Sequence, residues 1–213
     1  MAVARKIIEI VGCGPGAAEY VTAAAQRAVS DAELLAGSLR LVELFPDYYG
    51  ERLLVDAHIE PLLDRLETAW RLGRKVAVLV SGDPGLHSLA ERLLRRFGRE
   101  NCRVTPAVSS LQAAFALLGL PWDNVRVVSA HGRLPPDDMD LSPWDKLAVL
   151  GGTRDAMLWA ASAIERLRET HAAFLCEKLT LPGQRVCEVT ADQLRRLETA
   201  TLAILVLVRR DLL

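Results

Sequence analysis

The fold of this chain is decided by a stretch near its start, Ile7-Ile8-Glu9-Ile10-Val11-Gly12-Cys13-Gly14-Pro15-Gly16-Ala17. The mostly β-branched residues 7–11 predict a buried strand, and the glycines that follow predict a tight turn. Because glycine tolerates positive φ and lets a ligand reach the backbone, the turn is a candidate ligand site. The alternative is a merely tight connection between a strand and a helix.

The same turn fits the dinucleotide fingerprint Gly-x-Gly-x-x-Gly/Ala, with Ala17 in the last place. On that interpretation a pyrophosphate would rest on a helix N-terminus, as in a nicotinamide-dependent oxidoreductase. Two features count against it. Pro15 removes an amide hydrogen from the turn, and the next predicted strand, 33–36, ends in Gly37 and Ser38 without the acid that would bind a ribose.

The composition is that of an ordinary globular protein. With 213 residues, 51% of them hydrophobic and 25% charged, the chain can bury a sizeable core as one large domain or two small ones. The net charge of -1 argues against a nucleic-acid binder, which would need a basic excess. The longest apolar runs, 76–80 and 202–208, are too short to span a membrane, so we expect a cytoplasmic protein without a membrane partner.

The cysteines, Cys13, Cys102, Cys176 and Cys187, are scattered without a Cys-x-x-Cys pair. That spacing indicates neither a zinc site nor a disulfide framework. We therefore expect no metal, and thiols that are reduced and buried.

Strands and helices alternate along the first half of the chain. Strands are predicted at 33–36, 53–55, 75–80 and 103–104, and helices at 22–30, 38–45, 59–72, 86–97 and 111–118. Short connections between alternating elements predict a parallel sheet covered on both faces, with ligands at the carboxyl ends of its strands. Two further loops follow strands there, Ser81-Gly82-Asp83-Pro84-Gly85 and Thr105-Pro106-Ala107-Val108-Ser109-Ser110.

The break at Gly119-Leu120-Pro121-Trp122-Asp123 is the best domain boundary, giving domains 1–119 and 120–213. Beyond it, strands are predicted at 125–129, 147–150, 172–176, 185–189 and 202–208, with helices at 154–168 and from 191. A possible hairpin around Leu181-Pro182-Gly183 predicts a mixed sheet. The proline-rich segment 134–143 is expected to be a flexible surface loop or lid.

The three glycine- and serine-bearing loops, in this order and followed by a mixed second half, resemble the tetrapyrrole (corrin/porphyrin) methylase family. The resemblance implies a two-domain α/β fold of the class III methyltransferase type, with a parallel N-terminal sheet and a mixed C-terminal sheet. It also implies a homodimer with S-adenosylmethionine in the cleft between the halves, converted to S-adenosylhomocysteine. One departure is Ala107, where the family usually has glycine.

The resemblance assigns roles to the loop residues. It implies that the cofactor is bound by Gly82, Asp83, Pro84, Leu86, His87, Ser109 and Ser110, and that the tetrapyrrole faces Gly12, Gly14, Pro15 and Gly16. Asp83 has an alternative role, since an acid before a helix start can simply cap the helix.

The macrocycle carries carboxylates, with which Arg and Lys form charge-assisted pairs. Arg133, Lys178 and Arg185 are the candidates to bind them, with Arg40 a weaker one. His131 and Arg133 are the catalytic candidates. His131 could polarise or deprotonate the substrate, because histidine titrates near neutrality. His131 is equally explained as a hydrogen-bonded loop histidine. Methyl transfer from a sulfonium rests largely on alignment and exclusion of water, so a strong base is not obligatory.

Within the family, Leu118-Gly119-Leu120-Pro121-Trp122 and Ser129-Ala130-His131-Gly132-Arg133 are most similar to the branch that methylates C-5 of a cobalt-precorrin in cobalamin biosynthesis. The resemblance implies a functional partnership with a decarboxylating C-15 methyltransferase. Alternatives are methylation of another ring carbon or of a non-tetrapyrrole substrate, a nicotinamide-dependent oxidoreductase, and a non-enzymatic tetrapyrrole carrier.

Overall fold

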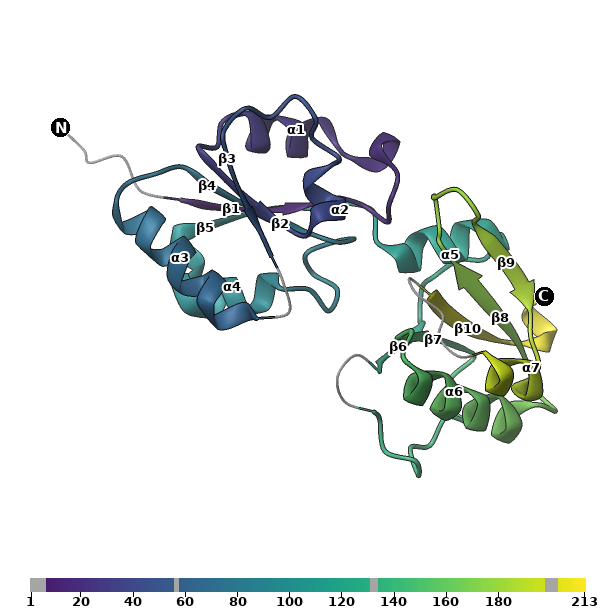
Figure 1. Cartoon of the computed structure of the whole chain (residues 1–213). Coiled ribbons are helices and arrows are strands. Elements are labelled where there is room, and N and C mark those ends of the chain that lie inside the picture. Colours follow the sequence, from purple (N-terminus) through teal and green to yellow (C-terminus); the bar gives the residue numbers. More distant parts are fainter. Residues whose placement is uncertain (1–6, 56–57, 131–133, 198–202) are drawn as a thin grey trace. The chain divides into compact units, whose positions relative to one another are not determined.

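The structure is a computed structural model that describes residues 7–55, 58–130, 134–197 and 203–213. The chain forms two compact units, Met1–Ser109 and Ser110–Leu213, each built on its own five-stranded sheet (Figure 1). The sequence placed the division ten residues later, at 119 and 120. The difference is helix α5 (Ser110–Leu118), which lies in the second unit.

The first unit is an all-parallel sheet with the strand order β3-β2-β4-β1-β5. Its elements are β1 (Ile8–Gly12), η1 (Ala18–Tyr20), α1 (Ala23–Ser30), β2 (Leu34–Gly37), α2 (Leu39–Val42), β3 (Glu51–Leu54), α3 (Ile59–Arg71), β4 (Val76–Val80), α4 (Ala90–Phe97), η2 (Arg99–Asn101) and β5 (Cys102–Thr105). This confirms the predicted parallel sheet. The central strands β1 and β4 are neighbours, so the loops that follow them emerge side by side.

Helices cover both faces of this sheet. On one face, α3 and α4 pack against alternate strand residues such as Leu34 and Ala36. On the other, α1 and α2 pack against the intervening residues, among them Leu35 (Figure 1). All five residues of β4 are buried, because a central strand covered on both faces needs apolar side chains throughout.

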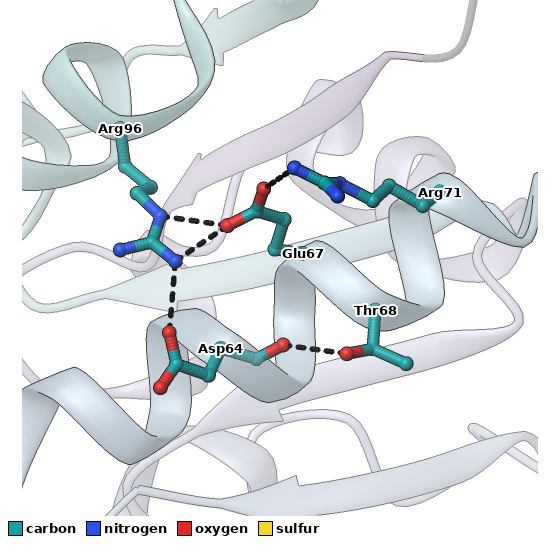
Figure 2. Close-up of polar contacts among 5 residues, drawn as sticks. All are labelled: Asp64, Glu67, Thr68, Arg71 and Arg96. Atoms are coloured by element: carbon teal, nitrogen blue, oxygen red, sulfur yellow. Dashed lines mark hydrogen bonds and ion pairs between the residues drawn. The ribbon is translucent and has the colours of Figure 1, made fainter.

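Helices α3 and α4 are joined by an ion-pair cluster on their outer surfaces (Figure 2). Arg96 Nε donates to Glu67 Oε2 at 2.8 Å, and Arg96 Nη2 donates to Asp64 Oδ1 at 2.8 Å. Arg71 contacts Glu67 from the next turn of α3. The hydrogen bond from Arg96 lowers the pKa of Glu67 below its ordinary value.

The helix starts follow local chemistry, with one correction. Thr22 Oγ1 accepts a hydrogen bond from Ala25 N at 3.1 Å and caps α1, as predicted. Helix α4 was expected to begin at residue 86 and instead begins at Ala90. Residues 86–89 form a turn and bends, because Leu86 N donates to the Asp83 carbonyl and His87 has a φ of 46°.

The second unit is a mixed sheet with the strand order β6-β7-β10-β8-β9. Its remaining elements are β6 (Arg126–Ser129), β7 (Lys146–Leu150), α6 (Arg154–Leu167), β8 (His171–Glu177), β9 (Arg185–Glu188), α7 (Ala191–Arg196), β10 (Ala203–Arg209) and η3 (Arg210–Leu212). Strands β6 and β7 are parallel and the other pairs antiparallel. The predicted mixed sheet and hairpin are therefore confirmed.

The segment 134–143, expected to be a surface loop or lid, is anchored to this second core. Leu141 is buried, and Arg166 Nη1 on α6 donates to the Asp137 carbonyl at 2.9 Å. Trp144 also packs against this core. Within the described residues, no helix combines the length and apolar composition that crossing a membrane requires.

Candidate functional site

The first two loops are joined to each other through their backbones. Gly14 N donates to Gly82 O at 3.3 Å, Gly82 N donates to Gly14 O at 2.9 Å, and Cys13 N donates to Val80 O at 3.0 Å. Gly14 has a φ of 77° and Gly82 a φ of 65°, a backbone region that favours glycine. The two loops thus form one small two-stranded bridge beyond the ends of β1 and β4.

The third loop meets the other two at Gly12. A Cβ atom placed on Gly12 would lie 2.7 Å from Pro84 Cδ and 2.8 Å from Ala107 Cβ, distances that real Cβ atoms essentially never show. Gly12 is therefore required by close packing of all three loops. The sequence predicted the three loops separately, and the structure brings them together into what we call the loop cluster, residues 12–16, 81–88 and 105–109.

Asp83 ties the second loop to the third. Its Oδ1 accepts a hydrogen bond from Gly85 N at 2.8 Å, and its Oδ2 accepts one from Ala107 N at 3.0 Å. Asp83 does not cap α4, which begins at Ala90; there Ser88 Oγ accepts from Ala90 N at 3.1 Å. Both carboxylate oxygens of Asp83 are thus occupied in fixing the loop backbone.

The backbone hydrogen bonds of the first loop disfavour the dinucleotide interpretation. A pyrophosphate site needs free amide hydrogens at the start of a helix. Here the Cys13 amide donates to Val80 O at the end of β4, the Gly14 amide donates to Gly82 O in the second loop, and Pro15 has no amide hydrogen. Helix α1 begins only at Ala23, after the intervening turn η1.

The remaining candidates of the first unit differ in exposure. Gly12, Gly14, Pro15 and Gly16 are buried, Leu86 is half-buried, and His87 is exposed. Ser109 is buried with 5% exposure, whereas Ser110 opens α5 in the second unit. The cofactor and substrate roles of these residues stay predictions.

The candidates of the second unit lie on and beside the β8–β9 hairpin. Lys178 is exposed with a φ of 49°. Arg185 Nε donates to Glu177 Oε2 at 2.8 Å, so this guanidinium already has a carboxylate partner within the protein. His131 and Arg133 lie outside the described residues.

Three features of the loop cluster were not predicted from the sequence. A Cβ atom on Gly14 would lie 2.9 Å from Tyr20 Cβ, so Tyr20 closes one side of the first loop. The Ala107 amide reaches back to Asp83. Arg40 on α2 donates from Nη2 to Ser81 Oγ at 3.0 Å. No local pattern marks the last two pairs, because each joins segments that are far apart in the chain.

Cys13, inside the first loop, is not a nucleophile. Burial raises the pKa of its thiol to about 12, against smaller lowering effects of the Val80 backbone and the Arg40 charge. Since the thiolate is the reactive form, this side chain behaves as a small apolar residue. The described part of the loop cluster therefore offers an ordered backbone, an oriented carboxylate and a nearby guanidinium, an arrangement suited to holding a polar ligand.

Comparison with known proteins gives consistent results. Residues 8–195 match the profile of the family described as Tetrapyrrole (Corrin/Porphyrin) Methylases. The chain is 35% identical over 127 residues to the cobalt-precorrin-7 C(5)-methyltransferase of Salmonella typhimurium, and the match covers 60% of this chain and 62% of that relative's length.

Two solved structures resemble the whole chain. The precorrin-6Y methylase of cobalamin biosynthesis from Archaeoglobus fulgidus is 28% identical with a TM-score of 0.72, covering 96% of this chain and 99% of that one. The uroporphyrin-III C-methyltransferase of Thermus thermophilus, solved with S-adenosylhomocysteine, is 26% identical with a TM-score of 0.74, covering 95% and 92%. These likenesses confirm the predicted fold class.

Proposed function

The chain belongs to the tetrapyrrole (corrin/porphyrin) methylase family, and from this premise we propose that it is an S-adenosylmethionine-dependent C-methyltransferase of cobalamin biosynthesis. It methylates C-5 of a cobalt-precorrin-6B-type corrinoid to give cobalt-precorrin-7. The identity to a C(5)-methyltransferase supports the position, and the relative solved with S-adenosylhomocysteine supports the cofactor. The observation that carries the proposal is the convergence at Gly12 of three loops predicted to hold cofactor and substrate.

The loop cluster fits such a cofactor. Gly14 and Gly82 exchange two backbone hydrogen bonds, which hold the first two loops together. Asp83 holds the Gly85 and Ala107 amides in place, so the loop backbone is ordered before a ligand arrives. Preorganised backbone lowers the entropic cost of binding.

The bound cofactor supplies a methyl group activated by its sulfonium. The chain's residues contribute alignment, because Asp83 fixes the second and third loops relative to each other. The close approach of Gly12 to Pro84 and Ala107 leaves no room even for a methyl group where the three loops meet. Alignment and exclusion of water account for large rate effects in such displacements, and an electron-rich ring carbon needs no strong base.

Calorimetric titration tests the cofactor. We expect S-adenosylhomocysteine to bind with micromolar affinity, roughly -8 kcal/mol, and NAD not to bind. Binding of NAD alone would restore the oxidoreductase interpretation and overturn the proposal.

The ring position needs a separate measurement. With a methyl-13C cofactor and cobalt-precorrin-6B, we expect a single labelled methyl signal at C-5. A label at another carbon would retain the enzyme class and refute the position.

The resemblance also supports a cytoplasmic homodimer that works with a decarboxylating C-15 methyltransferase. Light scattering after size exclusion tests the dimer, with a monomer mass as the contrary result. Faster C-5 methylation by this chain when the C-15 enzyme is present tests the partnership, and an unchanged rate would contradict it.

A further inference from the structure

Arg40 places a guanidinium at the base of the loop cluster. It lies on α2, directly after β2, and its Nη2 donates to Ser81 Oγ at 3.0 Å. Ser81 is the first residue after β4, and Cys13 is the first residue after β1. Burial raises the pKa of Cys13, and the Arg40 charge offsets a small part of that effect. The side chain therefore lies beside the start of both glycine loops.

This guanidinium lacks a counter-charge among the described residues. Arg103 is paired with Glu9 and Arg185 with Glu177, whereas no described carboxylate lies within ion-pair distance of Arg40. Its Nη1 atom is buried and has no hydrogen-bond partner within the part of the chain that the structure describes. A buried, charged donor without an acceptor costs free energy, so native structures usually supply one.

The bond to Ser81 does not by itself explain this arrangement. The Ser81 hydroxyl is a neutral acceptor on an exposed residue, and it occupies one of the five N–H groups of the guanidinium. A hydrogen bond at such a position contributes little net stability. Arginine often binds carboxylates bidentately, and a bidentate carboxylate would satisfy Nη1 as well as Nη2.

We propose that Arg40 is the carboxylate-binding residue of the loop cluster. The inference rests on the proposed function and deepens it, because both expected ligands carry carboxylates: the amino-acid end of the cofactor and the acidic side chains of the macrocycle. The shared chemistry is a carboxylate held by Nη1 and Nη2 of Arg40. Which ligand supplies it is decided by matched pairs of probes.

The first pair is S-adenosylhomocysteine and S-adenosyl-3-thiopropylamine, which lacks only the carboxylate. The second is cobyrinic acid, with carboxylate side chains, and cobinamide, in which they are amides. Calorimetry gives the affinity of each probe for the natural chain and for the Arg40→Gln and Arg40→Lys variants. Arg27→Gln, at an exposed position of α1, is the control for loss of one positive charge.

We expect Arg40→Gln to weaken binding of one carboxylate probe by about 10- to 100-fold, the range for charged hydrogen bonds, and to leave the affinity of its carboxylate-free partner unchanged. Arg40→Lys should retain part of the affinity, because lysine keeps the charge without the planar fork. Arg27→Gln should change neither. The pair that responds identifies the ligand.

A substitution of Ser81, the hydrogen-bond partner of Arg40, distinguishes ligand binding from a structural role of Arg40. Ser81→Ala removes the hydrogen bond to Arg40 and leaves the guanidinium in place. If the bond only ties α2 to the residue after β4, Ser81→Ala will lower affinity as Arg40→Gln does, and equally for probes with and without the carboxylate. If Arg40 binds a carboxylate, Ser81→Ala will preserve the preference for the carboxylate-bearing probe.

The outcomes distinguish this inference from the proposed function. Binding of S-adenosylhomocysteine with equal affinity by the natural chain and by folded Arg40→Gln, together with unchanged cobyrinic acid binding, overturns the inference and leaves the function standing. Failure of the natural chain to bind any of the four probes overturns both. Circular dichroism and thermal unfolding confirm that each variant is folded.

Discussion

The Asp83 carboxylate accepts a hydrogen bond from the Ala107 amide at 3.0 Å, and this contact joins two loops that are 24 residues apart in the chain. The other oxygen of the carboxylate accepts from Gly85 N at 2.8 Å. Asp83 thereby acts on a ligand through the backbone it positions. Its substitution should disturb the geometry of the loops before it removes any direct contact.

Replacement of Asp83 by Asn tests this arrangement. The Asn side chain has one acceptor oxygen, so one of the two amides would face an NH2 group. We expect the free energy of unfolding to fall by about 1–3 kcal/mol, the cost of an unsatisfied donor, and S-adenosylhomocysteine affinity to fall at least severalfold. Urea denaturation and calorimetry measure the two effects, with the exposed Asp47→Asn as control. Unchanged cofactor affinity in folded Asp83→Asn would remove Asp83 from the site.

Replacement of Gly12 by Ala tests the packing of the loop cluster. The new Cβ would overlap Pro84 Cδ and Ala107 Cβ, and we expect a loss of about 1–3 kcal/mol in stability, typical of overpacking. Ala107→Gly should restore part of that loss in the double variant, because it removes one of the two overlaps. A double-mutant cycle by urea denaturation measures the coupling. Purely additive effects would show that the two residues do not meet.

The pH dependence of stability tests the buried carboxylate of Glu9. Burial raises the pKa of Glu9 above its ordinary value of 4.5, and Arg103 offsets part of the effect. Its Oε2 atom is buried and has no hydrogen-bond partner among residues 7–55, 58–130, 134–197 and 203–213. Since the folded-state pKa lies above the unfolded one, the stabilising contribution is complete below the unfolded pKa and is lost as pH rises through the folded pKa.

We therefore expect Glu9→Gln to flatten the pH dependence of the unfolding free energy between about pH 4 and pH 7. Arg103→Gln should steepen it, because the charge that lowers the pKa is removed. Urea denaturation across this range measures both slopes. A natural chain and a Glu9→Gln variant with identical slopes would contradict a raised pKa.

Thiol reactivity tests the burial of Cys13 and Cys176. Burial raises the pKa of each thiol to about 12. Because only about one thiol in ten thousand would be ionised at pH 8, alkylation should be very slow in the native protein and fast in urea. Mass spectrometry after brief iodoacetamide treatment locates the label, with the half-buried Cys102 and Cys187 as internal comparison. Rapid native labelling of Cys13 would mean that the first loop opens.

The sheet architecture was readable from the sequence because apolar runs such as Val76–Val80 are characteristic of buried parallel strands. The start of α4 could not be predicted from the sequence. Residues 86–89 continue the apolar pattern of the helix, but the turn at Asp83 and the hydrogen bond from Ala90 N to Ser88 Oγ delay its start to Ala90. Local hydrogen bonding here outweighs helical periodicity.

The candidate site was predictable in part. Glycine-rich turns after strands identify loops that approach one another, because parallel strands end at one edge of a sheet. The pairing of Asp83 with Ala107, and of Arg40 with Ser81 across 41 residues, depends on tertiary placement. Nothing in either segment specifies its partner, so these contacts could be found only in the folded structure.

The position of β10 in the second sheet has a consequence for biosynthesis. This strand, Ala203–Arg209, lies between β7 and β8 at the centre of its sheet, although it follows every other strand in the chain. The first sheet has all its strands once Thr105 has been made, so it can fold while translation continues. On the ribosome, the second sheet stays in two unjoined halves, β6–β7 and β8–β9, until the last strand emerges from the exit tunnel and unites them.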